Sequence, residues 1–175
     1  MQLSIVQTAR LKIEPLEKRH AAELHPILSD PRIYTYIPQD PPSLSALQIR
    51  YELLETRSSP DGTEAWLNWA LRLQHEGVCI GTIQATISPG QTALIAYELG
   101  PDYWGKGYAT EALTWLLNEW KETHEVATAE ALVDTRNQAS IRLLERFAFE
   151  RIETIENADV FKGQPSDEYR YERIL

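Results

Sequence analysis

The sequence predicts a mixed α/β fold, built on a mostly antiparallel sheet with helices on both of its faces. Two patterns lead to this prediction. Between residues 67 and 99, apolar residues recur at every second position in three successive segments, which indicates neighbouring antiparallel strands. From residue 92 onward, strand-like and helix-like segments alternate, which is typical of mixed sheets. The 175 residues are about the length of one domain, so we expect a single domain over residues 1–175.

The N-terminal third shows one short strand and two helices. Apolar and polar residues alternate across residues 10–16, which predicts a strand. Residues 17–29 place apolar side chains on one helical face, and the pattern stops before Pro31, which favours the end of a helix. Ser43 is a good N-cap, and apolar residues follow it at helical spacing as far as Leu54.

Three strands then form a meander. The first two, residues 67–73 and 79–87, are separated by a short turn that contains Gly77, so they should pair as a hairpin. Residues 92–99 form the third strand, and both of its faces are largely apolar. We therefore expect this third strand to be central in the sheet and covered on both sides.

The C-terminal part alternates helices and strands. Apolar residues spaced i, i+3, i+4 and i+7 over residues 113–120 predict a helix. We then expect a strand at residues 129–133, a helix at 137–147, and two strands at 151–155 and 168–174.

The composition excludes several classes of protein. A net charge of −9, with 17 scattered basic residues, argues against a nucleic-acid partner, because phosphate neutralisation needs clustered Lys and Arg. No apolar run approaches the ~18 residues of a membrane span, and residues 1–10 lack the regions of a signal peptide. Cys79 is the single cysteine and the four histidines have no ligand spacing, so we expect a cytoplasmic protein without a metal ion.

A glycine-rich segment connects the predicted central strand to the next helix. The strand ends at Gly100-Pro101, and Gly105 and Gly107 lead directly into the helix. Glycine leaves backbone N–H groups accessible, and the first N–H groups of a helix lack intrahelical partners and lie at the positive end of its dipole. These features suit a pyrophosphate, to which Lys106 could add a charged contact. A tight strand-to-helix turn explains the same glycines equally well, and no Walker or dinucleotide-binding pattern is present.

Two blocks of the chain resemble one family. Residues 101–112 (PDYWGKGYATEA) resemble the acetyl-CoA-binding motif of the GNAT acetyltransferase superfamily, in particular of the branch that includes the ribosomal-protein N-terminal acetyltransferases. Trp104 replaces the Gln or Arg of that family's Gln/Arg-x-x-Gly-x-Gly/Ala pattern, as is usual in this branch. Residues 133–149 resemble the branch's Asn-x-x-Ser…Gly-Phe block, with Ala148 in place of the glycine. A glycine there often ends a helix in the left-handed region, so alanine should cost some stability.

The resemblance implies a binding mode and a single GNAT domain with a splayed central parallel strand pair. Acetyl-CoA would lie where residues 92–99 and 129–133 splay apart, with its pantetheine along the first strand and its pyrophosphate on the glycine-rich segment. The residues that the resemblance assigns to acetyl-CoA are Leu99, Trp104, Gly105, Lys106, Gly107, Tyr108, Ala109, Thr110 and Asn137.

The resemblance also implies direct attack of a neutral primary amine on the thioester, which needs a base and stabilisation of the oxyanion and thiolate. Glu98, at the end of the central strand, is the candidate base and could act through a water. Alternatively, it faces a polar pocket edge or pairs with an arginine. Many GNAT enzymes have a tyrosine acid where this chain has Leu144, so Ser140 is the candidate for polarising or protonating the sulfur. Alternatively, Ser140 is an ordinary hydroxyl bonded to the helix backbone.

The acceptor and the assembly stay open at this stage. A peptide N-terminus, an amino acid, a polyamine and an antibiotic are all candidate acceptors, and a homodimer is a candidate assembly. Four aromatic residues are candidates for lining the acceptor pocket, although such residues more often belong to a core: Tyr34, Tyr36, Trp66 and Trp69.

A non-catalytic acyl-CoA-binding sensor or scaffold is the alternative to an N-acetyltransferase. The absence of the tyrosine acid favours this alternative, whereas the intact Gly105, Gly107, Asn137 and Glu98 disfavour it.

Overall fold

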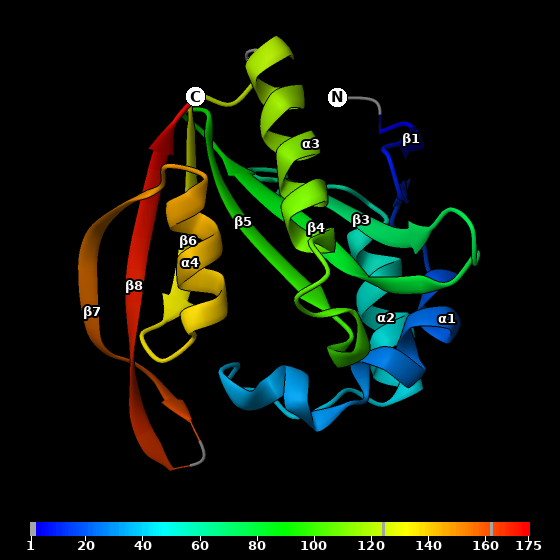
Figure 1. The fold of residues 1–175 in the computed structure, drawn as a ribbon, viewed down its shortest axis with the longest axis horizontal. Coiled ribbons are helices and arrows are strands. Elements are labelled where there is room, and N and C mark those ends of the chain that lie inside the picture. Colours follow the sequence, from blue (N-terminus) through cyan, green and yellow to red (C-terminus); the bar gives the residue numbers. More distant parts are fainter. Residues whose placement is uncertain (1–2, 124, 162) are drawn as a thin grey trace.

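The computed structural model describes residues 3–123, 125–161 and 163–175 (Figure 1). In chain order the elements are β1 (Val6–Gln7), β2 (Leu11–Pro15), α1 (His20–Leu28), the 3-10 helix η1 (Pro31–Thr35), α2 (Leu44–Leu54), β3 (Ala65–Leu73), β4 (Cys79–Ser88), β5 (Thr92–Leu99), the 3-10 helix η2 (Pro101–Tyr103), α3 (Tyr108–Thr123), β6 (Thr128–Asp134), α4 (Gln138–Arg146), β7 (Glu150–Phe161) and β8 (Gln164–Ile174).

The strands form one sheet in the order β1-β2-β3-β4-β5-β6-β8-β7. Neighbouring strands are antiparallel except for β5 and β6, which are parallel. β5 and β6 pair only from Thr92↔Thr128 to Leu94↔Glu130, although both strands continue beyond these residues. The two strands therefore diverge toward their C-terminal ends, and the expected mixed sheet with a splayed parallel pair is confirmed.

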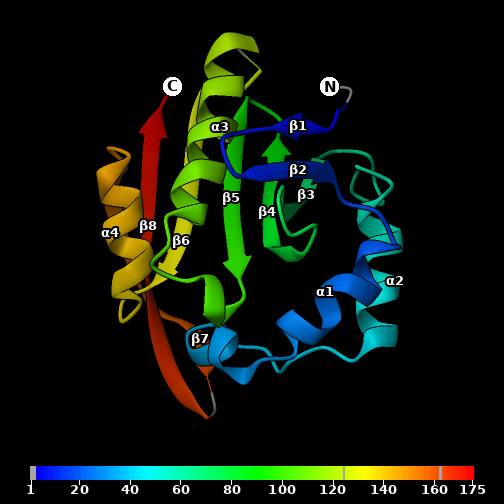
Figure 2. The same cartoon turned by 45° about the vertical axis from the view of Figure 1, so that its right-hand side comes forward.

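Helices cover both faces of the sheet, and β3 shows how. Trp69 and Leu71 of β3 belong to the larger core, together with the buried residues of α3 and α4. Ala70, which points to the opposite face, belongs to a smaller core built on α1 and α2. In Figures 1 and 2, α3 lies over the central strands, whereas α1 and α2 pack against each other beside β3 and β4.

One face of β5 is open, which corrects an expectation from the sequence. β5 is central in the strand order, and Ala93 and Ile95 are buried under α3. On the other face Leu94 is 39% exposed and Ala96 is exposed. The reason is that α1 and α2 contact β4 and β3 and do not extend across the start of β5. The apolar pattern on both faces of β5 therefore predicted its central position correctly, but the prediction that helices cover both faces was wrong.

Several element boundaries also differ from the predicted ones. The first helix begins at His20, because the backbone before it forms i→i+3 turns: the His20 N–H donates to the Glu17 carbonyl (3.0 Å) and the Ala21 N–H to the Lys18 carbonyl (3.1 Å). The last two strands are longer than expected and pair with each other as a hairpin. The register between them shifts twice along β7, at 151–153 and 155–159. These irregularities interrupt the alternation on which a strand prediction depends.

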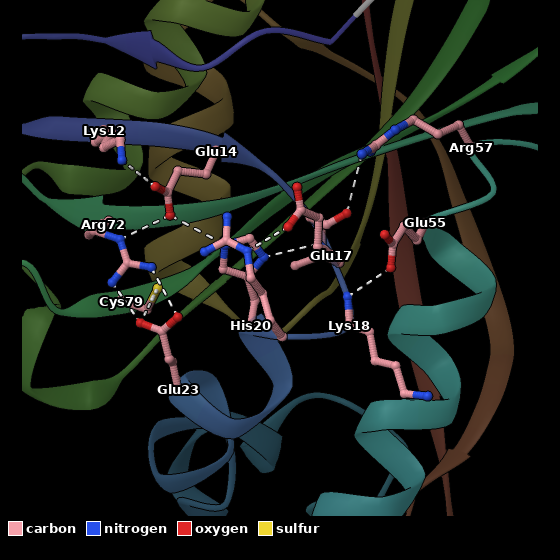
Figure 3. A network of polar contacts seen from close by, with 12 residues as sticks. Lys12, Glu14, Glu17, Lys18, His20, Glu23, Glu55, Arg57, Arg72 and Cys79 are labelled. Carbon is pink, nitrogen blue, oxygen red and sulfur yellow. Dashed lines mark hydrogen bonds and ion pairs between the residues drawn. The ribbon is translucent and has the colours of Figure 1, made fainter.

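A polar network holds α1 against the sheet (Figure 3). Glu14 of β2 is buried and pairs with Lys12 Nζ (2.6 Å) and Arg72 Nε (2.9 Å). Arg72, from β3, also pairs with Glu23 of α1 (2.6 Å). His20 Nε2 lies 3.3 Å from the Glu14 carboxylate. Although burial opposes ionisation, the hydrogen bonds and charges of Lys12 and Arg72 hold the pKa of Glu14 at about 2. The buried charge is therefore compensated, as a folded chain requires.

Two local predictions about helix ends are confirmed. The Ser43 hydroxyl accepts a hydrogen bond from the Ala46 N–H (3.2 Å) and caps α2. Ala148 has φ = 56°, in the left-handed region, just after the end of α4. The alanine thus occupies the conformation for which glycine is preferred.

Candidate active site

A cavity of about 570 Å³ lies where β5 and β6 diverge. Its lining comes from the end of β5, the loop before α3, the first turn of α3, one side of α4 along its length, and η1 with the two residues after it. The cavity brings together both candidate catalytic residues and all but one of the residues assigned to acetyl-CoA: Glu98, Ser140, Leu99, Trp104, Gly105, Gly107, Tyr108, Ala109, Thr110 and Asn137. The exception is Lys106, whose exposed side chain places Nζ 5.7 Å from the centroid of the Tyr103 ring.

The glycine-rich loop presents backbone donors to this cavity. Gly105 and Gly107 have φ values of 69° and 82°, which residues other than glycine rarely adopt. The first hydrogen bond of α3 runs from the Glu111 N–H to the Gly107 carbonyl (3.0 Å). The N–H groups of residues 108–110 therefore have no partner inside the helix, and these residues line the cavity. The positive φ angles explain the glycines as a tight turn, and the unpaired helix start additionally suits an anion.

The N-terminal arm braces this loop, a feature that sequence reasoning missed. The Glu111 carboxylate accepts hydrogen bonds from Thr8 Oγ1 (2.6 Å), Arg10 N (2.7 Å) and Arg10 Nε (2.7 Å). Arg10 Nη1 donates to the carbonyl of Lys106 (2.8 Å), and a Cβ added to Gly107 would lie 3.3 Å from Arg10 Nη2. Burial opposes ionisation of Glu111, but the hydrogen bonds from Thr8 and Arg10 hold its pKa below the ordinary value.

Main-chain groups at the C-terminal end of β5 point into the opening between β5 and β6. The Gly100 N–H donates to the Ile80 carbonyl on β4 (2.9 Å). Because hydrogen-bonding directions alternate along an antiparallel pair, the main-chain groups of Tyr97 and Leu99 point away from β4, toward the opening. The Leu99 carbonyl accepts a hydrogen bond from Trp104 Nε1 (2.7 Å). The tryptophan of the loop is thereby fixed to the end of the strand.

Glu98 lies on the opposite face of β5 from Tyr97. Its half-buried carboxylate accepts a hydrogen bond from Thr82 Oγ1 (3.3 Å). Burial raises the pKa of Glu98, although the charge of Arg50 and the bond from Thr82 act in the opposite direction. Within the described residues Glu98 forms no ion pair with an arginine at 4.0 Å or less, so the arginine-pairing alternative is not observed. A carboxyl with a raised pKa can accept a proton more readily than an exposed one.

The start of α4 positions Ser140. Asn137 is the N-cap of the helix, and its Oδ1 accepts a hydrogen bond from the Ser140 N–H (3.2 Å). Across the part of the chain that the structure describes, the Ser140 hydroxyl makes no hydrogen bond to the helix backbone. Leu144, one turn later, is 1% exposed and belongs to the core. The side chain of Tyr97, which no motif singled out, lies close to Ser140 inside the cavity.

A buried carboxylate supports the junction between β6 and α4. Asp134 accepts hydrogen bonds from the Arg136 backbone N–H (2.8 Å), Arg136 Nε (2.9 Å) and Ser166 Oγ (2.6 Å). Burial alone would raise the pKa of Asp134, but these hydrogen bonds lower it to about 2. Ser166 comes from β8, so the interaction depends on the strand order and carries no signal in the local sequence.

The four aromatic candidates lie in different environments, and one of them lines the cavity. Trp69 and Tyr34 are buried, and the Tyr34 hydroxyl donates to the Leu28 carbonyl (2.9 Å). The Trp66 indole N–H donates to Glu64 (3.0 Å), and the residue does not line the cavity. Tyr36, in contrast, lines the cavity, and the Arg136 guanidinium lies 6.0 Å from the centroid of its ring.

Two negative observations complete the description of the site. Among residues 3–123, 125–161 and 163–175, no group of three or more His, Cys, Asp or Glu side chains is arranged to hold a metal ion. The helices of the described chain are all too short or too polar to cross a bilayer.

The comparison with known proteins defines the class of this protein as an acyl-CoA-dependent acetyltransferase. The family model of an acetyltransferase (GNAT) domain matches residues 10–150, and the chain belongs to this family.

Known relatives agree with this assignment over nearly the whole chain. The chain is similar to an uncharacterised N-acetyltransferase p20 of Bacillus licheniformis, with 25% identity over 97% of this chain and 95% of the relative. It is also similar to the solved structure of a Salmonella typhimurium acetyltransferase that modifies the N-terminal serine of ribosomal protein L7/L12 (TM-score 0.85, 19% identity, 98% of this chain and 99% of that chain). A ribosomal L7/L12 α-N-protein acetyltransferase in complex with coenzyme A matches equally well (TM-score 0.85, 19% identity, 98% of both chains). At these identities, the solved structures establish the fold alone.

Proposed function

We propose that this protein acetylates a primary amine, a peptide N-terminus or a small amine, and that the cavity at the β5–β6 splay is its active site. The observation that carries the proposal is the start of α3, whose unpaired N–H groups line the same cavity as Glu98 and Ser140. An anion site and a candidate base in one cavity are what an acyl-CoA-dependent transfer needs.

In this proposal acetyl-CoA is a substrate that the backbone recognises. Its pyrophosphate would accept hydrogen bonds from the N–H groups of residues 105–110, and its pantetheine would pair with the free edge of Tyr97 and Leu99. Asn137 would lie beside the pantetheine arm, because it lines the cavity at the start of α4. The side chain of Lys106 is exposed and does not line the cavity, so it would contribute only long-range attraction.

The amine nitrogen would attack the thioester carbonyl carbon while Glu98, through a water, takes the proton that the nitrogen loses. The tetrahedral intermediate then collapses, the C–S bond breaks and its electron pair remains on the sulfur. Ser140 would donate a hydrogen bond to the sulfur. Two observations support this role: Ser140 lines the cavity, and within the described residues its hydroxyl makes no hydrogen bond to the helix backbone.

A peptide N-terminus is the first acceptor to test, because two of the similar solved proteins are described as acting on a ribosomal protein N-terminus. The proposal also includes one domain over residues 1–175, a cytoplasmic location, no nucleic-acid or membrane partner, and a homodimer as an assembly to be tested. The charge of −9 and the free, buried Cys79 support the location and the absence of nucleic acid.

A non-catalytic acyl-CoA sensor or scaffold is the second candidate function. It is favoured by one observation: Leu144 is buried in the core at the position where many members of the family have a tyrosine acid. Acetyl-CoA binding without acetyl transfer to any amine would support it.

The first test is calorimetric titration of the protein and its Gly107→Glu variant with acetyl-CoA. The added carboxylate would lie beside the proposed pyrophosphate, so affinity should fall by about 100-fold or more. Gly62→Glu is the control for the charge and the backbone conformation, because Gly62 also has a positive φ (73°) but lies away from the cavity, with open space around it. This control should bind like the wild type. A wild type that binds neither acetyl-CoA nor longer acyl-CoAs contradicts the proposal. A panel of N-terminal peptides, amino acids and polyamines then separates transfer from mere binding.

A further inference from the structure

Tyr97 carries a buried hydroxyl that the proposed mechanism does not use. The residue lies on β5 beyond Leu94, the last β5 residue paired with β6, so its side chain stands in the splay. Its Oη atom is buried and, within the described residues, has no hydrogen-bond partner. A buried hydroxyl without a partner is unfavourable, and such groups are often held for a ligand or a reaction.

The nearby polar group is the hydroxyl of Ser140. Both residues line the cavity. The Ser140 hydroxyl acts as a hydrogen-bonding neighbour that lowers the pKa of Tyr97, while burial raises that pKa by more. The two hydroxyls therefore lie near each other in the cavity without forming a hydrogen bond, and burial raises the pKa of Tyr97, so the tyrosine keeps its proton and can act as a donor.

The arrangement along β5 separates two chemical roles. Successive residues of a strand point to opposite faces, so Glu98 and Tyr97 lie on opposite sides of the same strand end. The Glu98 face would receive the proton from the amine, and the Tyr97 face meets the first turn of α4. Ser140 is held there by its own N–H, which donates to Asn137 Oδ1.

We propose that Tyr97 is a positioning residue for the leaving group: its hydroxyl donates a hydrogen bond to Ser140 Oγ and thereby aims the Ser140 proton at the sulfur of CoA. This inference rests on the proposed function. When the C–S bond breaks, the electron pair stays on the sulfur and the thiolate accepts the hydrogen bond from Ser140. The amine proton goes to Glu98, and the thiolate is protonated by solvent after release, so no proton is lost from Tyr97.

The experiment needs no amine acceptor, because it measures recognition of the sulfur itself. Affinities for CoA and for desulfo-CoA, which lacks the sulfur, are compared by calorimetry for the wild type and for Tyr97→Phe. The wild type should prefer CoA. In Tyr97→Phe, desulfo-CoA should bind as in the wild type and the preference for CoA should fall about three- to tenfold, as expected for loss of one hydrogen bond in a polar network.

Two further variants test whether Tyr97 acts through Ser140 and whether the effect is specific to the cavity. Ser140→Ala should reduce the preference in the same way, and the double variant should lose little more, because both residues act on one contact. Tyr171→Phe is the matched control: it removes another largely buried tyrosine hydroxyl, which donates to Glu145 (3.1 Å) outside the cavity, and should leave the preference unchanged.

Three results would overturn the inference: an unchanged preference in Tyr97→Phe, equal loss of affinity for both ligands, or additive effects of Tyr97→Phe and Ser140→Ala. A wild type that does not distinguish CoA from desulfo-CoA also overturns it and leaves the proposed function in place. A wild type that binds neither ligand removes the proposed function, and this inference with it.

Discussion

The two ends of the cavity are built in different ways. The end at α3 is made by the backbone of one continuous segment, residues 104–110, whose shape depends on two glycines with positive φ. The end at α4 is made by side chains from separate elements, including Glu98 of β5 and Ser140 of α4. A backbone site depends on local conformation, whereas a side-chain site depends on the packing that brings distant residues together. Substitutions should therefore separate binding from chemistry.

Glu98→Gln should have the largest effect on chemistry. Loss of the base should lower kcat by about 100-fold or more, with an unchanged affinity for acetyl-CoA. The wild-type rate should rise with pH as Glu98 ionises, above the ordinary range of a carboxyl because burial raises its pKa. The rate of the variant should not show this rise with pH.

Steady-state kinetics across pH and calorimetry check this prediction. Glu168→Gln is the control, because Glu168 is another half-buried carboxyl whose pKa is raised by burial, but it does not line the cavity. Equal loss of kcat in both variants would show that Glu98 acts through the fold rather than on the amine.

Asp134→Asn should weaken the side-chain end without touching the glycine loop. Asp134 is ionised in the folded chain down to a pKa of about 2, against an ordinary value of 3.8. Its stabilising effect is therefore present above pH 3.8 and is lost as the pH falls toward 2. At pH 7 the variant should be less stable by about 2 kcal/mol, and the difference from the wild type should shrink below pH 4.

Denaturant unfolding between pH 7 and pH 3 measures this effect. Asp30→Asn is the matched control, because Asp30 also accepts hydrogen bonds from the backbone and side chain of the arginine two residues later. Asp30 lies in a more exposed position, so the control should change stability little. A difference that is as large at pH 3 as at pH 7 would mean that Asp134 acts by packing rather than by charge, because the charge effect should already be partly lost at pH 3.

Arg10→Ala should weaken acetyl-CoA binding and spare the chemical step, whereas Glu98→Gln should do the reverse. Without the guanidinium, the Lys106 carbonyl and the Glu111 carboxylate lose hydrogen bonds, and the loop is less well ordered. The affinity for acetyl-CoA should fall about tenfold, while kcat at saturation stays near the wild-type value. Arg19→Ala removes an exposed arginine paired with Glu17 and should change neither quantity. A fall in kcat alone would contradict the assignment of Arg10 to the loop.

Ala148→Gly should have the smallest effect and should spare both ends. Glycine adopts the left-handed conformation at residue 148 (φ = 56°) without strain, so the variant should gain about 1 kcal/mol in unfolding free energy. Ala46→Gly, inside α2, should instead lose about 0.5–1 kcal/mol. Thermal unfolding distinguishes these outcomes, and a destabilised Ala148→Gly would show that the methyl group has a packing role that outweighs the strain.

Much of the fold could be predicted because its signals are local. The Ser43 cap, the hairpin of β3 and β4, and the helix of residues 113–120 each follow from periodicity or from a residue with one strong conformational preference. The open face of β5 and the length of β7 could not be predicted in this way. Cover depends on where distant helices pack, and the register shifts in β7 break the alternation that reveals a strand.

The candidate site likewise has local features that could be predicted from the sequence and long-range contacts that could not. The glycine-rich loop could be located from the sequence, because positive φ angles and an unpaired helix start are properties of a few consecutive residues. The brace from Arg10 to Glu111 spans 101 residues, and the contact from Asp134 to Ser166 spans 32. Neither follows from spacing, since each requires a particular strand order and register.

The fold class, the family resemblance and the position of the proposed pyrophosphate loop could all be read from the amino-acid sequence, because each depends on short-range patterns of apolar residues and glycines. Which side chains meet in the cavity depends on how the elements pack. The divergence of β5 from β6 leaves room for Tyr97 beside Ser140, and the alternation of side chains along β5 places Glu98 on the opposite face. The physical reason is that backbone conformation is set by neighbours along the chain, whereas hydrogen-bond partners are set by neighbours in space.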